Sequence, residues 1–517
     1  MVTTDLAAPV RSTAAPKPRG SRAPLVALLL GTAGVVYRVV LTALEVPPTN
    51  SDEGTMGLAA LHVLHAGEHP AFFYGQHYMG TLEAYLALPL VALTGPTVVA
   101  LRLPAIVLYA AFLWLMYRLT TRLYPRPWFA VAVVGLLALG SDRVLKNEVI
   151  AAGGYPEINT AGAALLLLAI GLALGGGRRL ARFAAWGLVA GLMLWDDWLL
   201  LPYLAVAGAL LVAFCRRELA GRAGAALAGA TMIGAAPLIW YNVTARPGQD
   251  SISVFLDQSH GGAATLATRL YNGVLSGVPM GTGLCQPNAC GQVQLAWGAV
   301  YPVLLVLAGV LAWRALRAAR ERSARVVEAG RLALVVAAGA SLLSYAQSSA
   351  AVHHPVESAR YLHCLAISLP AVLWPLWSAT GRLWRTASVA LLAGLTAAMV
   401  YATGALVAYA PVYRAQARDG RVLIEALDRL HVTRMYADYW TCDRVVYLTG
   451  ERIVCAVVGD DLGPGQDRYA PYRATVAAAP DAPYVFPVGS PQQEAYEAAG
   501  GTGVVLDVVG YRIYRSR

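Results

Sequence analysis

Twelve apolar runs fill most of the sequence, and many of them approach the length of a bilayer crossing. A transmembrane helix needs about 20 predominantly apolar residues. Charged residues make up only 14% of the chain, whereas about a quarter of the residues of a soluble protein are charged. We therefore predict an all-α polytopic membrane protein. The runs cover residues 24–44, 78–94, 98–117, 127–140, 158–175, 183–195, 198–214, 223–241, 295–313, 331–348, 360–378 and 387–410.

Arginine clusters separate the apolar runs and indicate how the chain is oriented. Such clusters are typical of cytoplasmic loops, so the net charge of +10 does not indicate nucleic-acid binding. All of them become cytoplasmic if the amino terminus is cytoplasmic and residues 78–94 return to the side from which they came. The clusters lie at residues 118–126, 178–182, 216–222, 314–325 and 382–385.

The run at residues 78–94 has the features of an interfacial helix. It is short, contains Pro89 and carries Glu83 near its start. We therefore predict about eleven spans plus this interfacial helix, in a plasma membrane of the bacterial type. The predicted domains are a disordered basic cytoplasmic tail (residues 1–23), a multi-span membrane domain (24–410) and a soluble extracytoplasmic domain (411–517).

Residues 411–517 differ in pattern from the rest of the chain. Short apolar runs alternate with Gly, Pro and Asp, which predicts a small α/β domain. Strand patterns lie around Met435 and Val454, at 484–487 and at 503–514, and helix patterns lie at 420–430 and 491–499. No phosphate-binding loop or dinucleotide signature occurs in this part.

The cysteines are informative by position. Cys285 and Cys290 share one polar loop, and Cys442 and Cys455 share the tail. Both pairs are predicted to be extracytoplasmic, where disulfides persist. Whether either pair is bonded stays open, and no cysteine spacing resembles a zinc site.

Among the predicted extracytoplasmic segments, the first loop (residues 45–97) is the richest in side chains that can take part in catalysis or ligand binding. Asp52 and Glu53 directly follow the first span. The pair can be a simple helix start, with Ser51 or Asp52 as the N-cap and Glu53 in the first turn. The same loop also holds carboxylates, imidazoles, phenols and glycines, among them His69, Tyr74, Tyr78 and Glu83. A surface loop of this composition favours a ligand-binding role.

Three motifs in and after this loop resemble those of the GT-C class of membrane glycosyltransferases. They are Asp52-Glu53-Gly54, the segment Tyr78-x-Gly80-Thr81-x-Glu83, and Leu101-Arg102-Leu103-Pro104 at the next span. The likeness is strongest to the bacterial relatives of dolichyl-phosphate-mannose protein mannosyltransferases and of lipid A aminoarabinose transferases. The segment Arg360-Tyr361-Leu362 ahead of a late span agrees with this resemblance.

The resemblance implies an inverting glycosyltransferase that uses a polyprenyl-phosphate sugar donor and an extracytoplasmic acceptor, which is a protein, a lipid or a glycan. Asp52 matches the acidic position of the family and is expected to be the base, with Glu53 binding the acceptor or supporting Asp52. Arg102, Arg360 and Tyr361 are expected at the donor phosphate, although Arg102 can also reach lipid headgroups. Substrate binding is expected at His69, Tyr74, Tyr78, Glu83 and Glu157.

The second extracytoplasmic loop departs from the family pattern. It offers Asp142, Glu148 and Glu157 but no Asp-x-Asp or Asp-x-Glu. Glu157 is the residue chosen, and a divalent cation stays an open possibility, with no metal ligand assigned. The Trp195-Asp196-Asp197-Trp198 segment is expected to turn between two spans, or alternatively to hold an acceptor or a cation.

Two other function classes compete with a glycosyltransferase. A transporter or flippase of lipid-linked sugars places charged groups and broken helices near the bilayer midplane. Here the predicted spans are nearly free of charge, and the carboxylates lie at one surface. A non-catalytic cell-envelope assembly protein is the third reading, and it requires the loop carboxylates to be dispensable.

Overall fold

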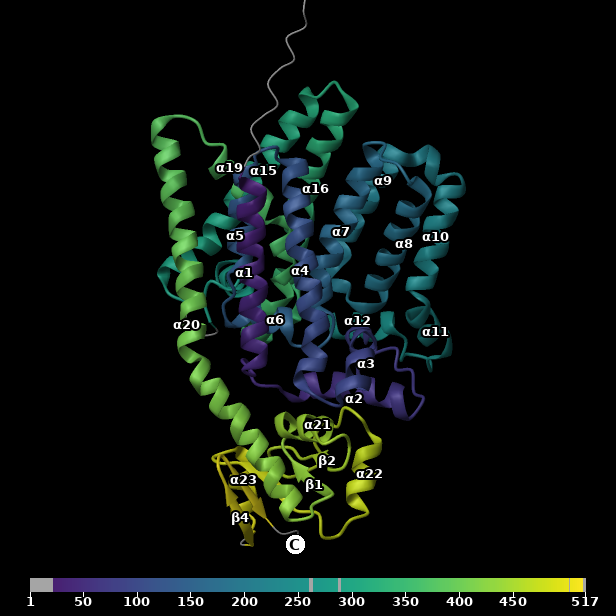
Figure 1. Cartoon of the computed structure of the whole chain (residues 1–517), viewed down its shortest axis with the longest axis vertical. Coiled ribbons are helices and arrows are strands. Elements are labelled where there is room, and N and C mark those ends of the chain that lie inside the picture. The colour runs from purple at the N-terminus through teal and green to yellow at the C-terminus, as the bar shows by residue number, and fades with distance from the viewer. Residues whose placement is uncertain (1–21, 260–263, 287–289, 502, 515–517) are drawn as a thin grey trace, which may run out of the picture.

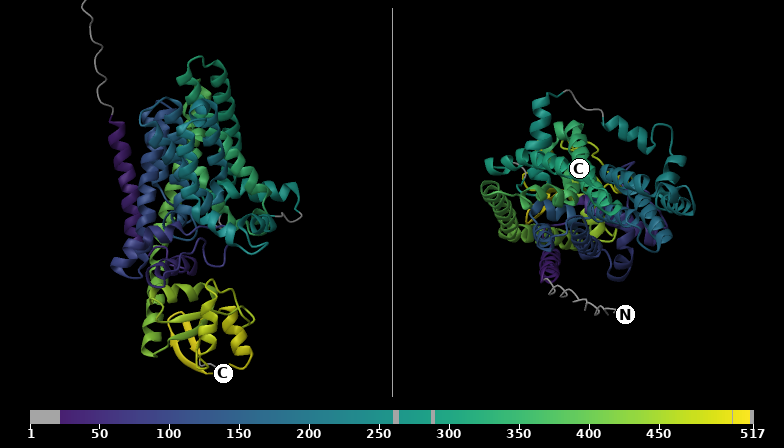
Figure 2. Two further views of the ribbon diagram at one scale, coloured as in Figure 1. Left: turned by 90° about the vertical axis from the view of Figure 1, so that its right-hand side faces the viewer. Right: turned by 90° about the horizontal axis from the view of Figure 1, so that it is seen from above.

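A helical bundle and a small α/β unit make up the protein (Figure 1). The computed structural model describes residues 22–259, 264–286, 290–501 and 503–514. Most of the predicted amino-terminal tail, residues 1–21, lies outside the described residues. The α/β unit, here called the C-terminal unit (residues 434–514), lies beyond one end of the bundle (Figures 1 and 2).

Within the residues that the structure describes, the bundle contains eight helical segments that are long and apolar enough to cross a membrane. Two sharply bent helix pairs raise the number to ten if each pair is one span: α5 (Pro127–Ala138) with α6 (Asp142–Val149), bent by 88°, and α10 (Arg222–Gly234) with α11 (Ala236–Thr244), bent by 60°. The chain is therefore a multi-pass membrane protein. The eight segments are α1 (Ala23–Ala43), α4 (Val98–Leu123), α7 (Tyr155–Ala173), η1 with α9 (Trp198–Leu200 and Leu201–Leu219), α15 (Gln292–Ala318), α16 (Arg322–Gln347), α18 with η3 and α19 (Pro355–Ser358, Ala359–Ser368 and Leu369–Trp377), and α20 (Arg382–Arg429).

Helix α8 (Arg179–Asp196) accounts for the difference from the predicted number of spans. It covers the predicted run at residues 183–195 and packs along α10. Arg179, Arg182 and Asp196 lie within its 18 residues, so it is less apolar than the eight segments above. The count of about eleven spans stays a prediction.

Helix α20 connects the bundle to the C-terminal unit. Its 48 residues give a length of about 72 Å, more than twice the hydrocarbon thickness of about 30 Å. It runs through position 411, the predicted domain boundary, without a break. Leu383, Trp384, Val389 and Tyr401 on its first half are at least 60% exposed, as expected for side chains that face lipid.

The first loop forms two helices at the end of the bundle that faces the C-terminal unit (Figure 1). They are α2 (Ser51–His65) and α3 (Leu82–Thr94). Helix α3 has 13 residues and contains Pro89, so at 1.5 Å per residue it is too short to span a bilayer. Shorter helices occupy the other loops: α12 (Ser251–Ser259), α13 (Leu266–Leu270), η2 (Tyr271–Leu275), α14 (Gly277–Gly281) and α17 (Ser349–His353).

The C-terminal unit contains a five-stranded sheet in the order β2-β1-β3-β5-β4. β1 pairs in parallel with β2 and β3, and β5 pairs antiparallel with β3 and β4. The strands are β1 (Arg434–Ala437), β2 (Val454–Val457), β3 (Tyr484–Pro487), β4 (Val504–Val508) and β5 (Tyr511–Tyr514), and the helices are α21 (Tyr439–Leu448), α22 (Pro471–Ala477) and α23 (Pro491–Ala498).

The sequence patterns match the strands and α23 but not α21 and α22. Helix α21 contains Tyr, Trp, Thr and Val residues, which individually favour strands. Residues 420–430, predicted as a separate helix, are the end of α20. The helical structure of α21 and α22 is therefore decided by tertiary packing rather than by local propensity.

Both cysteine pairs that the sequence left open are bonded. Cys285 and Cys290 have Cα atoms 5.1 Å apart, and Cys442 and Cys455 have Cα atoms 5.3 Å apart. The second bond joins α21 to β2. It therefore ties the helix that contacts α2 to the sheet of the C-terminal unit.

Helix α2 packs closely on α21, and two glycines of α2 permit this contact. A Cβ atom at Gly54 would lie 2.5 Å from the Asp443 carbonyl oxygen, and one at Gly57 would lie 2.5 Å from the Tyr447 ring. The Thr55 hydroxyl donates to Asp443 Oδ2 at 2.7 Å, and the Tyr447 hydroxyl donates to the Thr97 carbonyl at 3.0 Å. The C-terminal unit is thus held against the first loop at close range.

We expect Gly57→Ala to destabilise this contact, because the new methyl group overlaps the Tyr447 ring. Overpacking of this kind costs about 1–3 kcal/mol. Thermal unfolding of the purified protein and the rate of proteolysis of the C-terminal unit measure the effect. Gly404→Ala in α20 is the matched control, since a Cβ there meets nothing within 4 Å; equal stability of the two variants contradicts the prediction.

Candidate functional site

Asp52 lies in the first turn of α2, between the bundle and the C-terminal unit. The N-cap of α2 is Asn50, whose side chain accepts a hydrogen bond from the Glu53 backbone N–H at 2.9 Å. The simple helix-start interpretation proposed Ser51 or Asp52 as the N-cap, and this is wrong, because Asn50 is the N-cap. The Asp52 side chain is free for other contacts, and it is 16% exposed.

Two side chains of the C-terminal unit contact Asp52. The Tyr439 hydroxyl donates a short hydrogen bond to Asp52 Oδ1, and Arg468 Nη2 lies 3.3 Å from the same oxygen. Arg468 Nε in turn donates to the Tyr439 hydroxyl at 2.7 Å. Burial and the negative charge of Asp52 raise the pKa of Tyr439 above its ordinary value, so this hydroxyl remains a donor. Both of these contacts use Oδ1 rather than Oδ2.

Glu53 and Arg102 form a buried ion pair beside Asp52. Arg102 Nε and Nη2 each lie 2.7 Å from a different Glu53 carboxylate oxygen, and Nη1 donates to the Pro47 carbonyl at 2.8 Å. Both side chains are 0% exposed. This bidentate pairing satisfies the charges of both side chains. Arg102 therefore joins α4 to the start of α2 and does not extend toward lipid headgroups.

Arg360 has a buried hydrogen-bond donor without a partner and interacts electrostatically with Asp52. Its guanidinium lies 5.3 Å from the centre of the Tyr155 ring and 6.0 Å from that of Tyr361, and its Nε is buried without a hydrogen-bond partner. It interacts electrostatically with Asp52 and with Asp197. An unpaired buried donor is costly, so Arg360 is suited to receive an anionic ligand.

Arg143 brings a second positive charge near Arg360. Its Nη2 donates to the Val356 carbonyl at 2.6 Å, and it interacts electrostatically with Arg360. Two like charges in a partly buried region repel each other. A bound anion relieves that repulsion.

Four carboxylates lie close enough to interact electrostatically with one another: Glu83, Glu157, Asp196 and Asp197. All four side chains belong to residues less than 9% exposed, and both carboxylate oxygens of Glu157 and of Asp196 lack a hydrogen-bond partner. Glu83 Oε2 accepts from the Gly153 backbone N–H at 2.8 Å. Burial, reinforced by the charge of Asp197, raises the pKa of Glu83 above its ordinary value.

A pair of glycines lets this cluster form. Gly153 and Gly154 have φ values of 110° and 86°, which favour glycine. A Cβ at Gly153 would lie 2.1 Å from Met79 Cε, and one at Gly154 would lie 2.9 Å from Asp197 Cβ. The turn thereby brings the start of α7, with Tyr155 and Glu157, against the first loop.

Tyr78 lies in an aromatic group at the edge of the carboxylate cluster. Its ring stacks on Trp198 at a centroid distance of 6.0 Å and meets Phe255 edge-on at 5.6 Å. Burial raises the pKa of Tyr78, and the charges of Tyr361 and Asp197 add to the shift. Tyr78 therefore belongs to the same region as Arg360 and Tyr361.

Tyr74 and His69 are not brought to Asp52. Tyr74 belongs to a network with His62, whose Nδ1 lies 2.6 Å from the Tyr74 hydroxyl, and with Glu68, which accepts from that hydroxyl at 2.9 Å. His62 Nε2 also lies 3.1 Å from Glu451 of the C-terminal unit, and this hydrogen bond lowers the pKa of Glu451. His69 is exposed. Tyr74 thus contributes to the contact with the C-terminal unit.

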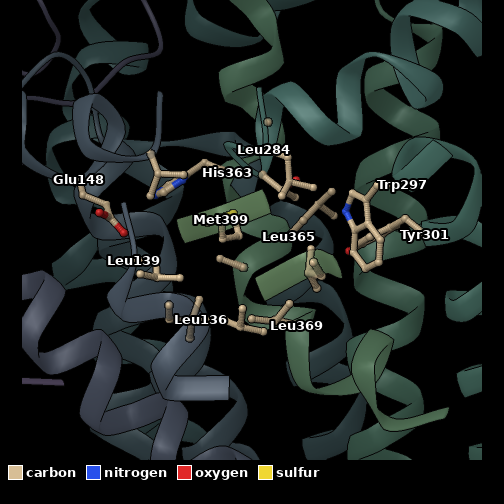
Figure 3. A pocket seen from close by; sticks show the side chains of 16 residues that line it. Leu136, Leu139, Glu148, Leu284, Trp297, Tyr301, His363, Leu365, Leu369 and Met399 are labelled. Atoms are coloured by element: carbon tan, nitrogen blue, oxygen red, sulfur yellow. The ribbon is translucent and has the colours of Figure 1, made fainter. Parts of the chain in front are cut away.

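A separate small cavity lies inside the bundle (Figure 3). Its volume is about 80 Å³, well below the roughly 300 Å³ at which ordinary ligand pockets begin. Its walls are mainly apolar, with Leu136, Leu365 and Met399 among them, and the Glu148 carboxylate forms one polar wall. Glu148 is paired with the buried Arg38, at 2.7 Å from its Nε. This cavity is a packing defect of the bundle rather than a polar binding site.

The described residues contain no group of three or more His, Cys, Asp or Glu side chains arranged to hold a metal ion.

Comparison with solved structures found a match over nearly the whole chain. ArnT from Cupriavidus metallidurans bound to undecaprenyl phosphate aligns with 96% of this chain and 98% of its own, at 14% identity and a TM-score of 0.56. The chain has the ArnT fold. The apo structure of ArnT aligns over the same shares at 14% identity and a TM-score of 0.54. No protein-family model and no curated protein matches the sequence.

The resemblance to GT-C glycosyltransferases that the first loop indicated is thereby confirmed as a likeness to ArnT, a lipid A aminoarabinose transferase. A weaker likeness, at a TM-score of 0.43 and 14% identity, covers 90% of this chain and 69% of the archaeal oligosaccharyltransferase AglB from Archaeoglobus fulgidus in complex with an inhibitory peptide and a dolichol-phosphate. Among these matches only the ArnT alignment includes nearly all of both chains, so it covers the C-terminal unit as well as the bundle.

Sequence reasoning missed Tyr439, Arg468 and Arg143. Tyr439 and Arg468 are separated from Asp52 by 387 and 416 positions, and no local pattern links such distant residues. Arg143 lies in the second loop, where only carboxylates were considered. The one available signal was the sequence Asp438-Tyr439-Trp440 directly after a predicted strand.

We expect Arg102→Met to destabilise the protein by about 3–5 kcal/mol, because it leaves the buried Glu53 carboxylate without a partner. The double variant Arg102→Met with Glu53→Gln should recover much of that loss, since the unpaired charge is gone. Thermal unfolding of the single and double variants measures the coupling. If the two losses simply add, Glu53 and Arg102 do not depend on each other.

Proposed function

We propose that this protein is an inverting glycosyltransferase that moves a sugar from a polyprenyl-phosphate donor to an extracytoplasmic acceptor. The observation that carries the proposal is the placement of Asp52 in electrostatic range of Arg360, on a chain with the ArnT fold. A base and an anion-binding cation beside each other match the two needs of the reaction. The acceptor must lose a proton, and the leaving phosphate must be stabilised.

Asp52 is the proposed base. The acceptor hydroxyl oxygen bonds to the anomeric carbon of the sugar, and its proton passes to Asp52 Oδ2. At the same time the bond from the anomeric carbon to the phosphate oxygen breaks, and polyprenyl phosphate leaves with the electron pair. Tyr439 and Arg468 hold Oδ1 in place, which orients Oδ2 without occupying it.

Arg360 is proposed to bind the donor phosphate, with Tyr361 beside it. The unpaired Arg360 Nε and the nearby Arg143 charge supply donors and positive charge where the leaving group gains negative charge. The Glu53 and Arg102 side chains already satisfy each other. Their proposed role is to position Asp52, and Arg102 is not among the proposed phosphate ligands.

The donor sugar is proposed to lie against the carboxylate cluster. Glu83 and Glu157 offer buried oxygens without partners, which can accept hydrogen bonds from sugar hydroxyls. Tyr78 offers an aromatic face near Tyr361. Tyr74 and His69 are proposed to act at the margin of the site, through the contact with the C-terminal unit.

The sidedness of the site follows from the charges of the chain. We propose that the amino terminus is cytoplasmic and that α2 and the C-terminal unit are extracytoplasmic, since the arginine clusters then face the cytoplasm. Two disulfides on the same side as α2 agree with an oxidising compartment. The donor's lipid tail can remain in the bilayer while its phosphate reaches Arg360.

Asp52→Asn should lower the rate of sugar transfer by roughly a hundredfold or more, because an amide cannot take the acceptor proton. Transfer from polyprenyl-phosphate sugars by the protein in nanodiscs measures this rate. The variant should keep its thermal stability, since Asn can still accept from Tyr439. Unchanged transfer by Asp52→Asn rules out the base assignment, and Asp250→Asn, at an acidic residue in another loop, is the matched control.

Arg360→Gln should weaken use of the donor and lower the rate of transfer by about a hundredfold, because the charge that stabilises the leaving phosphate is lost. The dependence of the initial rate on donor concentration measures both effects. Arg360→Lys keeps the charge but loses the planar donors, so it should recover only part of the rate. A purely structural role is indicated instead if both variants lose thermal stability and keep the donor dependence of the original protein.

A further inference from the structure

The C-terminal unit contains an open polar cavity of about 480 Å³, and one of its lining residues, Tyr439, donates a hydrogen bond to Asp52. This volume falls within the range of small-molecule sites. Its walls come from the start of α21, the loop after β2 and the start of α23, and they include Asp438, Trp440, Arg444, Asp460 and Gln492. Polar and apolar groups share its surface, unlike the apolar cavity inside the bundle.

Asp438 lines this cavity at the start of α21. The residue is 6% exposed, and its Oδ1 accepts from the Trp440 backbone N–H at 2.9 Å as the N-cap of α21. Its Oδ2 is buried. Asp438 therefore contributes negative charge to the wall rather than an exposed acceptor.

Trp440 gives the cavity an aromatic wall. Its side chain is 58% exposed, which is high for the largest aromatic residue in a folded unit. It meets the Tyr439 ring edge-on, with a centroid distance of 5.0 Å. An exposed indole beside polar groups suits a ligand that is apolar on one face and hydroxylated at its edges.

The charges on the walls exclude an anionic ligand. Asp438 and Asp460 are opposed by Arg444 alone, and Arg444 already donates to the Tyr511 hydroxyl at 2.7 Å. Gln492 Nε2 donates to Asp460 Oδ1 at 2.8 Å, which holds two planar polar groups side by side. Planar groups of this kind bind adjacent hydroxyls in pairs. The walls include no residue of β2 or β4, the two edge strands, so an extended peptide has no strand edge here with which to pair.

We propose that this cavity binds a neutral carbohydrate and that this carbohydrate is the acceptor of the transfer reaction, an inference that rests on the proposed function. The sugar ring stacks on Trp440, and its hydroxyls bond to the Asp460 and Gln492 pair. Tyr439 lines the same cavity and donates to Asp52. Tyr439 thus connects the cavity to the proposed base, and the proposed acceptor is a glycan rather than a peptide.

Saturation-transfer NMR with the full-length protein in nanodiscs tests the cavity. The probes are neutral di- and trisaccharides of mannose, glucose, galactose and arabinose. We expect at least one of them to bind, and Trp440→Ala to weaken its binding about tenfold. Trp440→Phe should retain part of the affinity. Trp384→Ala is the matched control, because Trp384 is 72% exposed and lies at the far end of α20.

Two outcomes overturn the inference: no saccharide binds, or Trp440→Ala and Trp384→Ala bind the saccharide equally well. Binding of a threonine-containing tripeptide in place of every saccharide also overturns it. Transfer assays separate this inference from the proposed function. If transfer proceeds and Trp440→Ala leaves the KM for the acceptor unchanged, only the cavity assignment is wrong. If no donor supports transfer although a saccharide binds through Trp440, the glycosyltransferase assignment and the acceptor role fail, and carbohydrate binding stands.

Discussion

The buried ion pair between Glu53 and Arg102 is the interaction on which the candidate site depends. It joins the first turn of α2 to α4, and the bond from Arg102 to the Pro47 carbonyl fixes the chain just before that turn. Asp52 precedes Glu53, so its backbone is held by the same contacts. The proposed role of Asp52 as a base requires a carboxylate with a fixed orientation, and these contacts supply that restraint. A pair with no exposed surface supplies it independently of salt and solvent.

The C-terminal unit packs against the opposite face of α2. Both the bundle and the C-terminal unit therefore contribute residues to the candidate site. Gly54 and Gly57 let α21 approach closely, and Asp443 accepts from Thr55. Burial raises the pKa of Asp443 to about 6. The same approach brings Tyr439 and Arg468 to Asp52. The environment of Asp52 is therefore built by both the membrane bundle and the C-terminal unit.

The helices and strands that produce a clear periodicity or composition could be predicted from the sequence. Apolar runs located the long helices, and the strands of the C-terminal unit followed from short apolar segments between Gly and Pro. The loop chemistry also predicted Glu83 and Glu157 as residues of one site, and the structure brings these two carboxylates near each other; the site that they would share with Asp52 stays a prediction. The partner of Arg102 was not predictable, because a lone arginine at a span end fits a headgroup contact as well as an ion pair. Contacts across nearly four hundred residues, such as that of Tyr439 with Asp52, leave no local pattern at all.

The distribution of charge also bears on the choice between chemistry and transport. Buried ionisable groups cluster where α2, α3 and the start of α7 meet the C-terminal unit, and the acidic groups there outnumber the arginines. The inner cavity of the bundle is small and mainly apolar, and its one carboxylate, Glu148, is neutralised by Arg38. A transport path needs polar groups along the membrane interior. Within the described residues the carboxylates of Glu53 and Glu83 lie instead on α2 and α3, at the end of the bundle that faces the C-terminal unit. The proposed transfer needs its polar groups at such an end, where a lipid-borne phosphate and a water-soluble acceptor can meet.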